Sequence, residues 1–261
     1  MKERKVIYYT NELNDEFSTA QITPKAIDGN YKYISTSLFN RFSHFFFYRI
    51  IATPIAYLYP KVLFENRIIG AEKLKEANNT GYFIYGNHTQ DICDAFIPNG
   101  MDVCRDKYFI VHPNNVSIPL LGRVTPLLGA IPLPDNMEAY RNFIKAIETR
   151  IAQKKAIVIY PEAHIWPYYT KIRPFKSVSF QYPIKHKVPA FCFTNTYQKR
   201  KLFKKPKIIT YIDGPFYPDE SLPLSQQRDE LRNRIFETMC ERAKCSNAVY
   251  IEYIKRDDKN G

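Results

Sequence analysis

The sequence predicts an α/β fold, a single layered domain with a mostly buried central sheet flanked by helices. Three observations support this. The chain has 261 residues, a length that suits one domain, and 45% of them are hydrophobic, enough for a substantial core. After Asn66, short apolar runs alternate with stretches of helical periodicity. An amphipathic, aromatic-rich segment precedes this part of the chain, and we expect helices that contact a membrane there.

The first two segments differ sharply in composition. Residues 1–35 mix Tyr, Asn, Asp and Lys without periodicity and predict a surface segment. Residues 36–65 are rich in Phe, Tyr, Ile and Leu, but cations and prolines interrupt them: Arg41, His44, Arg49, Pro54 and Pro60. A spanning helix needs about 20 consecutive apolar residues, so we expect two short amphipathic helices in a membrane interface. The alternative is a buried helix pair that caps the core.

Residues 66–256 carry the pattern of the predicted domain, and 257–261 form a solvated tail. Five apolar runs predict buried strands: 81–85, 107–111, 156–160, 188–193 and 207–212. A loop at 118–122 leads to a further strand near 128–133. Apolar residues at helical spacing predict long helices at 137–152 and 224–243. Strands that alternate with helices imply a layered fold around the sheet.

The charge balance predicts an acidic partner. The net charge is +12, from 38 Lys and Arg against 26 Asp and Glu, which suits an anionic membrane surface or nucleic acid. The aromatic residues cluster in apolar strands and in the 37–64 stretch, a pattern that favours core and membrane over nucleic acid. The basic run 199–207 is interpreted as a solvated hairpin turn or as a contact with anionic lipid or an acidic carrier protein.

Residues 1–30 contain no apolar run, so no signal peptide is predicted. We therefore expect a peripheral protein on the cytoplasmic face of a membrane. The five cysteines are an odd number without the spacing of a zinc site. Reduced thiols and no metal site are the expectation.

The segment after the strand at 81–85 carries the candidate chemistry. His88 follows this strand in a turn, and Asp91 and Asp94 come next as a helix begins. A carboxylate can accept a hydrogen bond from one ring nitrogen of histidine, which fixes the tautomer. The other nitrogen can then take a proton from an attacking hydroxyl. The alternative for a histidine near an aspartate is a helix cap or a surface pair.

Four blocks in order carry a family resemblance: Asn87-His88, Gly129-Ala130-Ile131, Tyr160-Pro161-Glu162 and Val188-Pro189. Their order and spacing resemble those of the glycerolipid acyltransferase family, the lysophosphatidic acid acyltransferase-like proteins (1-acyl-glycerol-3-phosphate acyltransferases). The likeness extends from about Phe83 to Tyr217.

The resemblance implies an enzyme that moves a fatty acyl group from a thioester to a hydroxyl of a lysophospholipid or related lipid alcohol. The donor is acyl-CoA or acyl-carrier protein, and no cofactor is implied. His88 matches the family's catalytic base. The family's aspartate lies five residues after its histidine, whereas Asp94 lies six after His88 and Asp91 lies three after it. The sequence context favours Asp94, and Asp91 is the alternative catalytic carboxylate.

The departures concern the acceptor. Arginines that the family uses to grip the acceptor phosphate are replaced by Asp135-Asn136 and by Ala163-His164-Ile165. We expect Arg173 and Lys176 to supply the missing charge, and Asn87 and Glu162 to complete the acceptor contacts. Glu162 has two further interpretations, a residue that fixes the catalytic loop and a buried partner of a cation. The alternative function is a catalytically inactive basic peripheral protein that binds anionic lipid.

Overall fold

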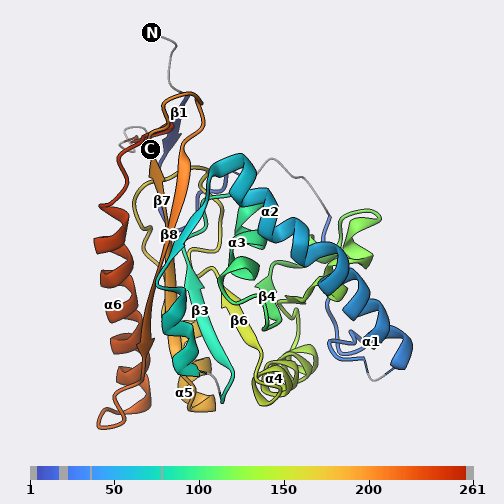
Figure 1. Cartoon of the computed structure of the whole chain (residues 1–261). Helices are drawn as coiled ribbons and strands as arrows, with labels where there is room; N and C mark the ends of the chain where they lie inside the picture. Colours follow the sequence, from blue (N-terminus) through green and yellow to red (C-terminus); the bar gives the residue numbers. More distant parts are fainter. Residues whose placement is uncertain (1–4, 18–22, 36, 78, 257–261) are drawn as a thin grey trace.

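A computed structural model describes residues 5–17, 23–35, 37–77 and 79–256; the predicted tail at 257–261 lies outside them. A seven-stranded sheet forms the centre of the molecule (Figure 1). In spatial order its strands are β2 (Arg67–Ile69), β8 (Lys207–Phe216), β7 (Ala190–Gln198), β3 (Tyr82–Gly86), β6 (Ala156–Ile159), β4 (Lys107–Val111) and β5 (Ala130–Pro132). The predicted α/β fold is confirmed.

The strands from β7 to β5 run parallel, whereas β8 is antiparallel to β7 and β2 is parallel to β8. The parallel strand β3 lies between β7 and β6 and is buried along its whole length. Its side chains alternate between two hydrophobic clusters, Phe83 and Tyr85 in one, Tyr82 and Ile84 in the other. The parallel carboxyl ends of β3, β6 and β7 therefore meet at one edge of the sheet.

Helices cover both faces of the sheet. One face carries α4 (Met137–Ala152), α5 (Gln181–His186) and α6 (Leu224–Ala243). The bounds of α4 and α6 are those predicted, because their apolar residues recur at helical spacing along one buried stripe. The other face carries α3 (Cys93–Met101), on which α2 (Thr53–Phe64) packs.

The predicted pair of short helices at 36–65 is instead one continuous helical segment. It comprises α1 (Leu38–His44), a π-helical stretch η1 (Phe45–Ala52) and α2. Proline is tolerated in the first turn of a helix, and Pro54 lies in the first turn of α2, directly after the wider π-helical stretch. Pro60 lies inside α2 without ending it. Within the described residues, no helix combines the length and apolar character needed to cross a bilayer.

Two side chains of η1 attach this segment to the domain. The buried Tyr48 donates a hydrogen bond to Asn99 Oδ1 (2.6 Å) and accepts one from the main-chain nitrogen of Lys107 (2.7 Å). Arg49 pairs with Asp106 and donates to the main-chain oxygen of Cys104 (2.8 Å). The segment crosses α3 in Figure 1, and its outward side leaves large apolar side chains exposed. They include Leu38, Phe39, Phe42, Phe45, Ile50, Ile55, Leu58, Val62 and Leu63.

A second, two-stranded sheet joins the two ends of the chain and was not predicted. In it β1 (Lys5–Tyr9) pairs in parallel with β9 (Ile251–Lys255). Trp166 is fully buried beside this sheet, stacked on Tyr253 at 5.1 Å between ring centroids and hydrogen-bonded to the main-chain oxygen of Asp15 (2.8 Å). The only tryptophan therefore fills a core in this structure.

Lys107, at the start of β4, gives the fold a testable pH dependence. Its buried ammonium donates hydrogen bonds to main-chain oxygens of Asp102 and Arg105. Burial lowers the pKa of Lys107 to about 7, whereas the pKa of a lysine in the unfolded chain is about 10.4. Between these values the unfolded chain binds more protons, so the free energy of unfolding rises with pH. Urea unfolding at pH ~7 and pH ~9 should show this increase in the wild type and a smaller one in Lys107→Met. Equal increases would contradict it.

Candidate active site

His88 lies two residues beyond the carboxyl end of β3 and forms a dyad with Asp94. Its Nδ1 is 2.8 Å from Asp94 Oδ2. The His88 side chain is 19% exposed, and its ring stacks on Tyr160 with 4.5 Å between centroids. Among the described residues, Nε2 of His88 has no hydrogen-bond partner. The second ring nitrogen is thus available to a substrate.

The carboxylate of Asp94 is buried at the amino end of α3 and is held by several donors. Besides His88, it accepts hydrogen bonds from the main-chain nitrogens of Thr89 (2.8 Å) and Gln90 (2.9 Å), and from Asn195 Nδ2 (3.3 Å). Burial raises the pKa of Asp94 above its ordinary value, against the hydrogen bond and charge of His88 and these main-chain donors. The amino end of a helix also favours a negative charge.

The geometry distinguishes between the two aspartates that the sequence left open. Asp91 lies on the exposed turn before α3, whereas Asp94 points back toward the loop that carries His88. The helix begins at Cys93, so Asp94 lies in its first turn. The additional residue between His88 and Asp94, relative to the family spacing, is accommodated in the turn, and the pairing is preserved.

Asn87 attaches the His88 loop to β7. Its Oδ1 accepts from the main-chain nitrogen of Asn195 (2.8 Å), and its Nδ2 donates to the main-chain oxygen of the same residue (3.1 Å). The Asn87 side chain is buried, and its two hydrogen bonds to the main chain of Asn195 resemble those that a neighbouring strand would make. The geometry therefore gives it a structural role in place of the predicted contact with the acceptor.

Asn195 is the site residue that the sequence analysis missed. Besides its bond to Asp94, its Oδ1 accepts from Thr210 Oγ1 (2.7 Å), and Thr210 Oγ1 accepts from Asn66 Nδ2 (3.0 Å). This buried polar chain connects β8 and Asn66, the residue before β2, to the dyad. The signal was in the sequence: Thr194, Asn195 and Thr196 continue an apolar strand, and buried polar groups need partners.

Glu162 follows β6 and holds the His88 loop from the other side. Its Oε2 accepts from the main-chain nitrogen of His88 (3.0 Å), and its Oε1 accepts from the main-chain nitrogen of Arg173 (2.9 Å). Burial raises the pKa of Glu162, opposed by the positive charge of Arg173 and by these donors. Two of the interpretations left open by the sequence fit this geometry: a residue that fixes the catalytic loop and a buried partner of a cation, here Arg173.

Arg173 is fully buried beside Glu162. Its guanidinium lies 3.5 Å from Glu162 Oε2 and also donates to the main-chain oxygens of Glu12 (3.2 Å) and His164. A guanidinium without exposed surface does not face an incoming phosphate in this structure. Its contacts tie the chain around residues 162–173 to the amino-terminal segment, in place of the predicted acceptor contact. Lys176, a further predicted contact, is exposed.

The residues that stand where the family has a phosphate-binding arginine have local structural roles. Asp135 accepts a hydrogen bond from the main-chain nitrogen of Ile27 (2.6 Å). Asn136 caps α4, because its Oδ1 accepts from the main-chain nitrogen of Ala139 (2.8 Å). Asp135 and Asn136 therefore stabilise the local fold at the position where the family has its arginine.

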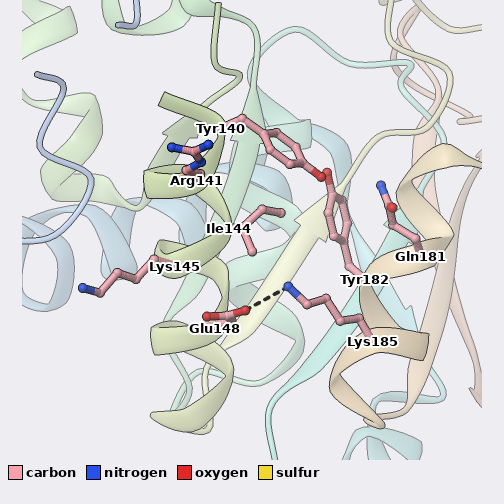
Figure 2. A pocket seen from close by; sticks show the side chains of 8 residues that line it. All are labelled: Tyr140, Arg141, Ile144, Lys145, Glu148, Gln181, Tyr182 and Lys185. Carbon is pink, nitrogen blue, oxygen red and sulfur yellow. Dashed lines mark hydrogen bonds and ion pairs between the residues drawn. The ribbon is translucent and has the colours of Figure 1, made fainter. Parts of the chain in front are cut away.

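Figure 2 shows a pocket between α4 and α5, separate from the dyad. It is lined by Tyr140, Arg141, Ile144, Lys145, Glu148, Gln181, Tyr182 and Lys185. Glu148 and Lys185 face one another across it at 3.0 Å, both largely exposed. Within the described part of the chain, no group of three or more His, Cys, Asp or Glu residues is arranged to hold a metal ion.

Comparison with known proteins identifies the class to which this dyad and fold belong. The model of the acyltransferase family matches residues 66–194, the part of the chain that contains His88, Asp94 and Glu162. Over these residues the chain matches the acyltransferase family, and the predicted resemblance to glycerolipid acyltransferases is confirmed. These findings support glycerolipid O-acyltransferase activity, in a family whose members generally need no cofactor.

The solved structures include one of similar fold, the 1-acyl-sn-glycerophosphate (LPA) acyltransferase PlsC from Thermotoga maritima. The TM-score is 0.56 at 18% sequence identity, and the alignment covers 81% of this chain and 89% of PlsC. At this identity the likeness shows that the fold is shared. No match was found among curated proteins.

Proposed function

We propose that this protein transfers a fatty acyl group from an acyl thioester to a hydroxyl of a lysophospholipid or related lipid alcohol at a membrane surface. One observation carries the proposal. His88 Nδ1 lies 2.8 Å from the buried carboxylate of Asp94, while Nε2 has no partner among the described residues. A histidine oriented in this way can act as a general base.

The proposed reaction proceeds without an acyl-enzyme. Asp94 accepts the Nδ1–H of His88, which leaves the Nε2 lone pair free to remove the proton of the acceptor hydroxyl. The hydroxyl oxygen attacks the thioester carbonyl, and a tetrahedral intermediate forms. The intermediate collapses as the carbon–sulfur bond breaks, and the imidazolium returns its proton to the leaving thiolate. The products are an ester and a free thiol, and His88 is neutral again.

The loop around His88 is built for this role. Glu162 and Asn87 hold it on opposite sides, through the main chain of His88 and through Asn195. Catalytic groups need such fixed positions because a small displacement costs a large part of the rate. This support favours an active enzyme over the alternative of an inactive lipid-binding protein.

The acceptor is proposed to be a lysophospholipid, in part because PlsC of Thermotoga maritima is named as an acyltransferase for such a lipid. The positions of the family arginines hold other residues here, so the headgroup contacts of this protein differ from the family pattern. Lys176 is the exposed cation among the predicted contacts. Acyl-CoA and acyl-carrier protein supply the same thioester and are both proposed donors.

The helical segment from α1 to α2 is proposed to dock on the cytoplasmic face of a membrane. Leu38 and Phe39 are 78% and 76% exposed, and apolar side chains continue along the outward side to Leu63. Exposed apolar side chains along a helical segment of a strongly basic protein suit the interface of an anionic bilayer. The segment would lie in the interface and not cross it.

A panel assay tests the proposed function. The purified protein, with liposomes, receives labelled acyl-CoA or acyl-carrier protein and a series of lysophospholipids and simple lipid alcohols. We expect one class of acceptor to yield labelled ester. No product from any pair, with liposome binding retained, would favour the inactive lipid-binding protein.

A comparison of Asp94→Asn with Asp91→Asn tests which aspartate acts with His88 in catalysis. An amide cannot replace the carboxylate that fixes the tautomer of His88 and stabilises its charged form, so we expect the rate of transfer to fall by about 10²–10⁴-fold. Asp91→Asn removes the same charge three residues earlier from an exposed turn and should change the rate less than about twofold. Steady-state rates of ester formation measure both. The reverse order would show that Asp91 is the catalytic carboxylate.

A further inference from the structure

The loop between β7 and β8, residues 199–206, combines positive charge with exposed apolar side chains. Leu202 is 90% exposed and Phe203 is 61% exposed. Exposed lysines lie on both sides of them: Lys199, Lys201, Lys204 and Lys205. Apolar side chains within a cluster of cations are typical of segments that insert into the surface of an anionic bilayer.

Arg200 fixes this loop to the end of α2. Its Nη2 lies 2.8 Å and its Nε 3.0 Å from Glu65 Oε1, and its Nη1 donates to the main-chain oxygen of Leu63 (2.9 Å). The guanidinium carbon also lies 4.5 Å from the centre of the Phe203 ring. The side chain of Arg200 is nearly buried by these contacts. The loop is therefore held in place, with Phe203 stacked and still exposed.

The position of the loop continues the apolar surface of the helical segment. Val62 and Leu63 at the end of α2 are exposed beside the residues that Arg200 contacts. The loop directly follows β7, so it lies at the carboxyl end of β7, and β7 runs parallel to β3, whose carboxyl end leads to the dyad. The positive charge of Lys205 opposes the rise in the pKa of the Cys93 thiol that burial and Asp94 cause.

We propose that the 199–206 loop is a second membrane contact, selective for anionic lipid, which together with the α1–α2 segment turns the active-site edge toward the bilayer. The inference rests on the proposed function. An acidic acyl-carrier protein is a different partner for the same charges. The bilayer is favoured because the exposed Leu202 and Phe203 continue an apolar surface already present on α2.

The first test compares binding to vesicles of phosphatidylcholine with binding to vesicles that also contain about one-third phosphatidylglycerol. The loop variant is K201Q/K204Q/K205Q. The control variant carries the same substitutions at exposed lysines of α4 and the turns that follow α4 and α5: K145Q, K154Q and K187Q. Each lysine near an anionic leaflet contributes a factor of about five, so the loss of three lysines should lower the affinity of the loop variant for the anionic vesicles by about 100-fold.

The control variant should keep the wild-type preference for anionic vesicles, and the loop variant should keep binding to neutral vesicles through the helical segment. Equal preference in the loop and control variants would overturn the inference. The inference would also be overturned if the loop variant lost binding to a purified acyl-carrier protein while its binding to vesicles was unchanged. The readout is binding and not turnover, so failure of the acyl-transfer assay and failure of this inference are separate results.

A second variant, Phe203→Trp, reports insertion directly. The single natural tryptophan, Trp166, is fully buried, so lipid-borne quenchers should act on the new side chain alone. We expect brominated anionic vesicles to quench its emission, and the effect to weaken as salt screens the lysines. Emission that is unaffected by brominated lipid, in protein bound to anionic vesicles, would overturn the inference.

Discussion

Replacing His88 with alanine is expected to lower the rate of acyl transfer by about 10²–10⁴-fold or more, because general base catalysis contributes about that much. In the variant, Asp94 keeps its bonds to the main-chain nitrogens of Thr89 and Gln90, but no group remains to take the proton of the hydroxyl. The loss should fall on kcat, since the imidazole acts on the reacting atoms. Steady-state rates of labelled ester formation over a range of acceptor concentrations measure it.

His164 provides a matched control. It lies two residues after Glu162, its side chain is 33% exposed and its imidazole is 3.5 Å from Glu16. His164→Ala removes the same group from the same neighbourhood without touching the dyad, and we expect a change of less than about threefold. Comparable losses in both variants would show that the effect of His88→Ala comes from a disturbed loop and not from a lost base.

The second large effect concerns stability and distinguishes the two roles considered for Arg173. Arg173→Met leaves the Glu162 carboxylate buried without its cationic partner. We expect the free energy of unfolding to fall by about 3–5 kcal/mol, as for other buried pairs that lose one member. Urea unfolding with constant m-value measures the change.

An exposed ion pair gives the control for Arg173. Lys185 and Glu148 are 3.0 Å apart, and their side chains are 55% and 47% exposed. Lys185→Met should therefore cost no more than about 1 kcal/mol. If Arg173→Met left stability unchanged and raised only the KM for the acceptor, the guanidinium would contact the acceptor phosphate, as the sequence suggested, and the structural role would be contradicted.

The sequence predicted the elements that local periodicity defines. The helices α4 and α6 and the parallel strands of the sheet contain enough apolar residues, at regular spacing, to be recognised alone. The pairing of β1 with β9 joins opposite ends of the chain, and no local pattern indicates such a contact. The prolines at 54 and 60 suggested a break in the amino-terminal helix, but a π-helical stretch before Pro54 lets the helix continue.

The site was predicted in part for a similar reason. His88 and Asp94 lie close together in the sequence, so a motif reveals them. The residues that support them come from distant segments: Asn195 lies in β7, and Arg173 follows a long loop after Glu162. A charged residue near the motif suggested a contact with substrate. Burial decides between such a contact and a structural pair, and a single sequence does not show burial.

A single-turnover experiment tests most directly the claim that His88 drives a direct transfer. Protein in excess over a donor with a labelled acyl group is mixed with acceptor lipid on vesicles, quenched, and separated into thioester, protein and lipid. We expect label to pass from thioester to lipid without residing on the protein, and to stay on the thioester in His88→Ala. Label on the wild-type protein, or undiminished transfer in His88→Ala, would contradict this claim.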